Sequence, residues 1–123
     1  MKPKGHLHLA TYCKDLLPFG SAQNASTLTV LLPFTDVGSE NQAIKVTLEN
    51  EDSTNTCDLI VEPSHNGVYP DSLRRQVVTV QPLSEGSIEI HDLMDTFIRV
   101  SAQTASPAFP VVSVKWGIVS RER

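Results

Sequence analysis

Apolar and polar side chains alternate along most of this chain. Ile44, Val46 and Leu48, for example, are separated by polar residues. Successive side chains of a β-strand point to opposite faces, so this period of two predicts strands with one apolar and one solvated face. From residue 26 onward it predicts about seven short strands, near residues 27–32, 44–49, 56–62, 74–81, 87–91, 97–102 and 111–118. The side chains expected to face the core are Leu28, Val30, Leu32, Ile44, Val46, Leu48, Cys57, Leu59, Val61, Val78, Val80, Ile88, Ile90, Ile98, Val100, Ala102, Val112, Val114, Trp116 and Ile118.

The segments between these strands carry turn residues rather than helices. The strongest hairpin candidate joins strands 44–49 and 56–62 through the turn residues 51–54. Two prolines and Asn66-Gly67 make residues 63–71 a loop, and residues 91–95 are short enough for a single helical turn. Without a helical layer, a sheet buries its apolar face against a second sheet, which predicts an all-β, antiparallel Greek-key β-sandwich. The pattern leaves an immunoglobulin-like and a jelly-roll-like sandwich open, although the Cys–Trp–Cys spacing of antibody domains is absent.

The first 25 residues differ from the rest, which predicts an N-terminal arm (1–25) ahead of the sandwich (26–123). His6 to Ala10 alternate, residues 16–19 are apolar, and residues 20–26 form a polar linker. Two interpretations stay open for this arm. It either adds a strand to its own sheet or reaches a neighbouring subunit.

Composition and charge narrow the classes of partner. At 123 residues and 13.5 kDa, one domain is expected. The net charge of −4 with scattered basic residues argues against a nucleic-acid partner. No apolar run reaches the roughly 20 residues that cross a bilayer, and residues 1–9 lack the apolar stretch of a secretory signal.

Few residues suggest catalysis or a cofactor. His6 and His8, with Cys13 nearby, are the best imaginable metal ligands, but no second pair with ligand spacing accompanies them, so no metal is expected. His91, Asp92 and Asp95 lack a neighbouring nucleophile motif, and the six glycines stand singly, without a phosphate-binding loop. The sequence therefore predicts no enzyme, no cofactor and no catalytic site.

Two further features concern the cysteines and arginines. A disulfide between Cys13 and Cys57 is one possibility that the sequence leaves open, but cytosolic synthesis argues against it. The alternative is that Cys57, which lies in an alternating apolar pattern, is a small core residue. Arg99 is expected on an outward face, either as a charge that protects a sheet edge or as a partner for an acidic subunit.

Three stretches carry a family resemblance: residues 25–34 (ASTLTVLLPF), residues 97–102 (FIRVSA) and residues 112–118 (VSVKWGI). They resemble the small β-sandwich head decoration, or cement, proteins of tailed bacteriophages. The resemblance implies a non-enzymatic virion protein, made in the host cytoplasm and mounted on the capsid exterior. It also implies a homotrimer that bridges neighbouring subunits of the major capsid protein.

On this hypothesis the arm and two loops form the subunit or capsid contacts. Their apolar side chains are Leu7, Leu9, Tyr12, Leu16, Leu17, Phe19, Val68, Tyr69 and Phe109. The alternative is a carbohydrate- or protein-binding sandwich module of a phage tail or cell surface, which calls for exposed aromatics or a calcium cage. Glu49, Glu51, Asp52 and Asp58 are the carboxylates available for such a cage. A small hydrolase is a third interpretation and needs a convergent polar pocket.

Overall fold

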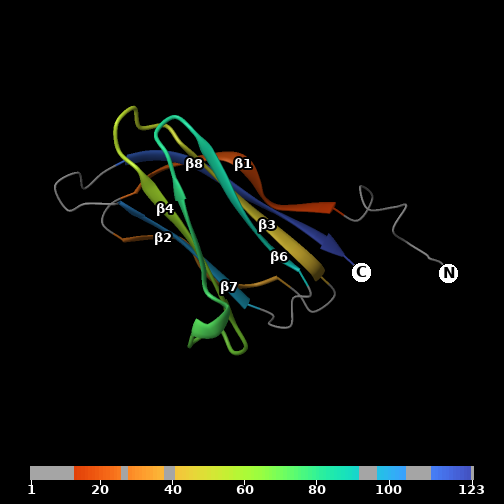
Figure 1. Ribbon diagram of the computed structural model, residues 1–123. Helices are drawn as coiled ribbons and strands as arrows, with labels where there is room; N and C mark the ends of the chain where they lie inside the picture. The colour runs from red at the N-terminus through yellow and green to blue at the C-terminus, as the bar shows by residue number, and fades with distance from the viewer. Residues whose placement is uncertain (1–12, 26–27, 38–40, 92–96, 105–111, 123) are drawn as a thin grey trace.

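The computed structural model describes residues 13–25, 28–37, 41–91, 97–104 and 112–122, with side chains for all of these except 13–24, 41–42 and 121–122. In these ranges the chain forms eight strands and one short 3-10 helix (Figure 1). In chain order they are β1 (Cys13–Ala25), β2 (Thr29–Asp36), β3 (Asn41–Asn50), β4 (Cys57–Ser64), η2 (Ser72–Arg74), β5 (Gln76–Val80), β6 (Glu85–His91), β7 (Phe97–Thr104) and β8 (Val112–Glu122). The described ranges contain no helix long and apolar enough to cross a membrane.

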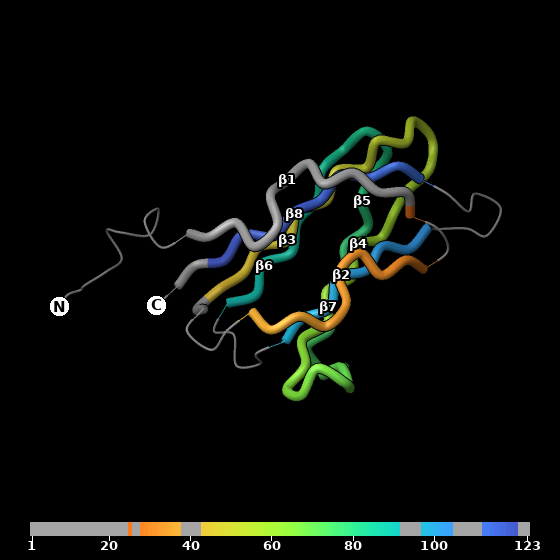
Figure 2. The backbone as a smooth tube through the Cα atoms, turned by 180° about the vertical axis from the view of Figure 1, so that it is seen from behind, coloured from red at the N-terminus to blue at the C-terminus, as the bar shows by residue number. Residues whose placement is uncertain are grey.

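The strands form two four-stranded sheets that lie face to face (Figure 2). Their orders are β1-β8-β3-β6 and β2-β7-β4-β5, and every pairing is antiparallel. Most connections therefore cross from one sheet to the other, and β4–β5 is the only pair of consecutive strands that are neighbours among the described elements. This interleaving is the jelly-roll arrangement. The predicted all-β sandwich is confirmed, and of its two forms the chain adopts the jelly roll.

The core lies between the sheets and consists largely of the predicted apolar positions. Ile44, Val46 and Leu48 of β3 are buried, while Lys45 between them is exposed. The inward residues of β4, β6, β7 and β8 are buried in the same cluster. Trp116 is also buried there, as predicted. A period of two therefore identified the core face correctly wherever a strand keeps its regular pleat.

Strand β2 departs from the predicted pattern. Leu28 and Val30 were expected to face the core but are exposed, whereas Leu31 is buried. Leu32 is partly buried against the core. The pairing of β2 with β7 shifts register between Val30 and Leu32 and again between Leu32 and Thr35. An extra residue puts the side chains before it and after it on opposite faces, so Leu28 and Val30, which precede the first shift, do not share a face with Leu32 as the alternation predicted.

The predicted hairpin between strands 44–49 and 56–62 is wrong. β3 and β4 belong to different sheets, and the turn between them carries the chain around a corner of the sandwich. Asn50, fully buried, holds this corner: its Nδ2 donates to the carbonyl oxygens of Asn55 (2.7 Å) and Val80 (3.3 Å), and its Oδ1 accepts from the Asp52 amide (2.9 Å). Asp52 Oδ2 in turn accepts from the amides of Thr54 and Asn55. The turn residues were recognised, but they close a corner rather than a hairpin.

Strand β1 lies in the segment expected to be an arm. Cys13–Ala25 pairs with β8 at the edge of the β1-β8-β3-β6 sheet, with register shifts between Asp15 and Ser21. For these residues the structure shows the first of the two open interpretations, in which the segment adds a strand to its own sheet. Residues 1–12 lie outside the described residues.

Candidate interaction surfaces

The loop between β4 and β5 presents three large apolar side chains to solvent. Val68 is 64% exposed, Tyr69 74% and Leu73 95%. This loop, which includes η2, projects from the bottom of the molecule in Figure 1, where it is coloured green. Val68 and Tyr69 were predicted contact residues, and both side chains are exposed. Leu73 was not among the predicted contact residues, because a single apolar residue between Ser72 and Arg74 is a weak signal in the sequence.

Hydrogen bonds to side chains hold this loop in one conformation. Ser64 Oγ donates to the Tyr69 carbonyl oxygen (2.6 Å) and accepts from the Gly67 amide (3.0 Å). Asn66 Oδ1 accepts from the amides of Val68 (2.8 Å) and Tyr69 (3.0 Å). At the far end of the loop, Asp71 caps η2 through the Leu73 amide.

Gly67 is required by the shape of the same loop. Its φ of +75° lies in the left-handed region, and a Cβ at this position would lie 3.1 Å from the ring of Phe97. The exposed side chains therefore sit on a preorganised support rather than on a chain that must be ordered when a partner binds.

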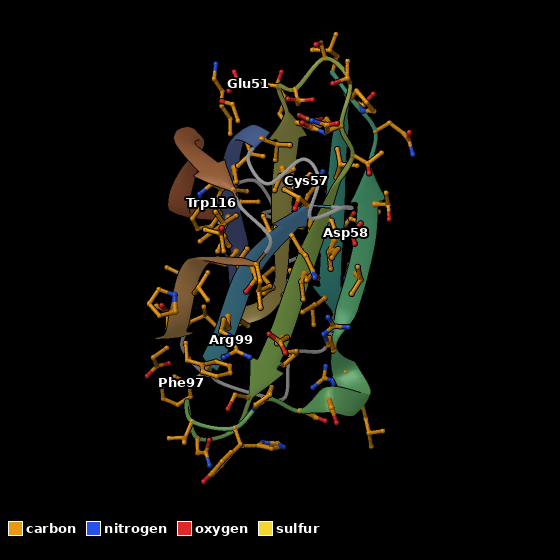
Figure 3. All side chains as sticks on the ribbon, turned by 90° about the vertical axis from the view of Figure 1, so that its left-hand side faces the viewer. Glu51, Cys57, Asp58, Phe97, Arg99 and Trp116 are labelled. Atoms are coloured by element: carbon orange, nitrogen blue, oxygen red, sulfur yellow. The ribbon has the colours of Figure 1, made fainter. Side chains whose placement is uncertain are left out.

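The outer face of the β2-β7-β4-β5 sheet carries a second candidate surface (Figure 3). A shallow hollow of about 200 Å³ lies on it. Its lining residues are Leu28, Val30, Ile60, Glu62, Arg75, Arg99, Ser101 and Gln103. The register places Val30, Ser101, Ile60 and Val77 in one row across the four strands.

A charged cluster borders this row. Arg99 on β7 contacts Glu62 on β4 through Nε (3.0 Å) and Nη2 (2.9 Å), both to Oε1. The Arg99 guanidinium also lies 4.6 Å from the centre of the Phe34 ring. Arg75 Nε lies 3.8 Å from Glu62 Oε2. Arg99 is outward, as predicted, but β7 is an inner strand, so the expected role in protecting a sheet edge is wrong. Its acidic partner is within the chain.

Groups considered for catalysis or metal binding do not converge in the described part of the chain. His91, the last residue of β6, is exposed and lies 3.4 Å from Glu89. Of the helical turn predicted at residues 91–95, His91 belongs to β6 and residues 92–95 lie outside the described residues. His6 and His8 also fall outside them. Among the described residues no group of three or more His, Cys, Asp or Glu side chains is placed to hold a metal ion.

Three of the four carboxylates considered for a calcium cage, Glu51, Asp52 and Asp58, have separate partners. Glu51 binds Lys115 (3.4 Å) and accepts from Ser113 (2.8 Å), while Asp58 accepts from Thr79 Oγ1 (2.7 Å). Hydrogen bonds from Asn55 and Thr54 lower the pKa of Asp52 below its usual value. These carboxylates make local structural contacts, and none of them belongs to a group of three or more metal-binding side chains among the described residues.

Cys57 is a core residue, as predicted. Its thiol is free and fully buried. Burial, with a smaller contribution from the Asp58 carboxylate, raises its pKa to about 11. Such a thiol carries almost no nucleophilic thiolate at neutral pH, so it does not form a reactive centre.

The other predicted contact residues are only partly covered. Leu16, Leu17 and Phe19 belong to β1, for which the structure describes the backbone but not these side chains. Leu7, Leu9, Tyr12 and Phe109 lie outside the described residues.

Comparison with known proteins identifies structures of similar fold but no family to which the chain belongs. Neither a protein-family model nor a curated protein sequence matches this chain. Several solved structures share its architecture.

PBSX exported protein XepA superposes with a TM-score of 0.62 at 12% identity, covering 100% of this chain and 40% of that one. Tripeptidyl peptidase 2 superposes with a TM-score of 0.61 at 7% identity, and the match covers 89% of this chain and 10% of that one. The VP2 subviral particle of infectious bursal disease virus superposes with a TM-score of 0.59 at 9% identity, and the match covers 89% of this chain and 33% of that one. This chain therefore spans 40% or less of each of these proteins, and identities this low show the fold alone.

Proposed function

We propose that this chain is a non-enzymatic structural protein of a phage virion that decorates the capsid exterior and bridges neighbouring subunits of the major capsid protein. The observation that carries the proposal is the β4–β5 loop, where a hydrogen-bonded frame presents Val68, Tyr69 and Leu73 to solvent. A rigid sandwich with an apolar tip is suited to filling a pocket on a neighbouring molecule. The likeness to the chain of a viral subviral particle supports the proposal at the level of fold.

The loop also explains why such a protein acts in many copies. Fully burying a large apolar side chain yields about 1.5–3 kcal/mol, so the three side chains of the loop supply at most about 4.5–9 kcal/mol before the cost of association is subtracted. That corresponds to weak binding by one loop alone. Further contacts from the segments around residues 1–12 and 105–111, and a homotrimer in which three loops act together, raise the effective affinity.

The first experiment measures where the chain is and in how many copies. Quantitative mass spectrometry of purified virions of the phage that encodes the chain is expected to find a copy number comparable to that of the major capsid protein. Light scattering of the purified chain is expected to give the mass of a trimer. Absence from the particle, or a few copies confined to the tail, would overturn the proposal; the second result would favour the binding-module alternative.

A second experiment tests the loop itself. Capsids that lack the chain are mixed with purified protein, and bound protein is measured after sedimentation. Replacing both exposed side chains (Tyr69→Ser with Leu73→Ser) is expected to weaken binding by about tenfold or more. The matched control is Leu83→Ser, which removes a leucine that is 69% exposed from the β5–β6 turn at the other end of the strands and is expected to bind normally.

A truncation of residues 2–12 tests the N-terminal contacts without removing β1, which starts at Cys13. The truncated protein is expected to keep the unfolding transition of the full chain but to bind capsids more weakly. Unchanged binding would exclude Leu7, Leu9 and Tyr12 as contacts.

A further inference from the structure

We propose that the hollow on the outer face of the β2-β7-β4-β5 sheet binds an extended peptide segment of a partner protein in which an acidic residue is flanked by aliphatic ones. The proposal is independent of the capsid role. It uses a different surface from the β4–β5 loop and requires neither a virion nor a trimer.

The floor of the hollow is made by two outward-facing residues that are nevertheless buried. Ile60 on β4 is 2% exposed and Ser101 on β7 is 3% exposed. They are neighbours in the sheet register, and taller side chains on both sides shield them. Leu28 and Val30 on the β2 side are exposed, and so is Val77 on β5. Exposed apolar surface thus flanks the hollow on both sides, and these flanking side chains, rather than the covered Ile60 and Ser101, offer contacts to aliphatic side chains of a ligand.

The shape of the apolar row favours a peptide over a compact small molecule. The row from Val30 to Val77 crosses four strands. Three strand spacings of about 4.8 Å make it about 14 Å long, which matches about four residues of extended chain. The hollow itself, at about 200 Å³, holds one or two aliphatic side chains from such a segment.

The charges beside the row define the acidic residue. Glu62 is mostly buried and is bound closely by Arg99, which also stacks on Phe34. Arg75 is 43% exposed, and its distance of 3.8 Å from Glu62 is too long for a hydrogen bond. Two guanidinium groups therefore face one carboxylate at this border. A ligand carboxylate that binds Arg75 through paired N–H donors completes the charge balance.

The experiment is an NMR titration of the ¹⁵N-labelled full-length chain with the probe N-acetyl-Leu-Glu-Leu-Leu-amide. Saturable shifts are expected at the amides of Ile60, Ser101 and Arg75, with weaker binding as salt rises. The Gln-containing counterpart of the peptide is expected to bind about tenfold more weakly. Absence of saturable shifts at about 10 mM peptide, or equal binding of the two peptides, would overturn the proposal.

Two variants separate the parts of the site. Arg75→Gln, at an exposed position, is expected to abolish the preference for the acidic peptide. Ser101→Leu fills the floor and is expected to weaken both peptides. Lys45→Gln is the matched control, because it removes one positive charge from the outer face of the other sheet and is expected to change nothing. If Arg75→Gln bound the acidic peptide as the unmodified chain does, the assignment of the carboxylate site would be wrong.

Discussion

Asn50→Ala tests the idea that a buried amide, and not a hairpin, directs the chain from one sheet to the other. The side chain makes three hydrogen bonds across the corner, with the backbone of Asp52, Asn55 and Val80. The bond to Val80 is buried and the bonds to Asp52 and Asn55 are partly buried, so water compensates for their removal only in part. At about 1 kcal/mol for each bond, the expected loss in the free energy of unfolding is about 3 kcal/mol. That is a large part of the 5–15 kcal/mol typical of a domain.

The assay is urea unfolding followed by the fluorescence of Trp116, the single tryptophan, which is buried in the core. With a typical slope of about 1.5 kcal/mol per molar urea, the midpoint is expected to fall by about 2 M. The matched control is Asn66→Ala. Asn66 Oδ1 accepts hydrogen bonds from two backbone amides, but Asn66 is exposed, so water replaces the lost bonds and the cost is expected to stay below about 1 kcal/mol.

The isosteric change Asn50→Asp refines the test. A carboxylate at this position faces the carbonyl oxygens of Asn55 and Val80, which accept hydrogen bonds from the native amide. Only the protonated acid can donate to them, so the folded state raises the pKa of the introduced group above its unfolded value of about 3.9. The variant is therefore expected to lose stability as the pH rises above about 4. A loss below about 1 kcal/mol for Asn50→Ala, or a pH-independent Asn50→Asp, would refute the reasoning.

Three further predictions concern single groups. Because burial raises the pKa of Cys57 to about 11, its thiol is expected to resist Ellman's reagent at pH 8 in the folded chain and to react on unfolding, measured in a Cys13→Ser background; fast reaction without urea would contradict this. Gly67→Ala forces a positive φ on alanine and a close contact with Phe97, so it is expected to cost about 1–2 kcal/mol in urea unfolding and to weaken capsid binding through the displaced loop. The pKa of Asp52 is lowered in the folded chain, so the contribution of its carboxylate to stability is present above the unfolded value of 3.8 and is lost as the pH falls through the lower folded value. The difference in free energy of unfolding between the native chain and Asp52→Asn, measured by urea unfolding, is therefore expected to shrink below pH 3.8. A constant difference would exclude this role.

The sequence by itself determined the strands and the core face of most of them. Alternation is a local property, so Ile44, Val46 and Leu48 had to face the same way in any sheet. Trp116 and Cys57 fell into this pattern and are buried accordingly. The exposed tip at Val68 and Tyr69 was also visible, because Asn66-Gly67 and the prolines exclude a central strand there.

Only the tertiary structure decided which strands pair and what covers the outer faces. Each of two consecutive strands has one apolar face, whether the strands form a hairpin or lie in opposite sheets. The alternation of apolar and polar residues is the same in both cases, so it could not distinguish a hairpin from the corner at Asn50. Register shifts in β2, between Val30 and Leu32 and between Leu32 and Thr35, break the alternation, so Leu28 and Val30 are exposed while Leu31 is buried. Ile60 points outward yet is buried, because residues from β2, β5 and β7, distant in sequence, stand around it. Burial of this kind depends on side chains that only the assembled sheet brings together.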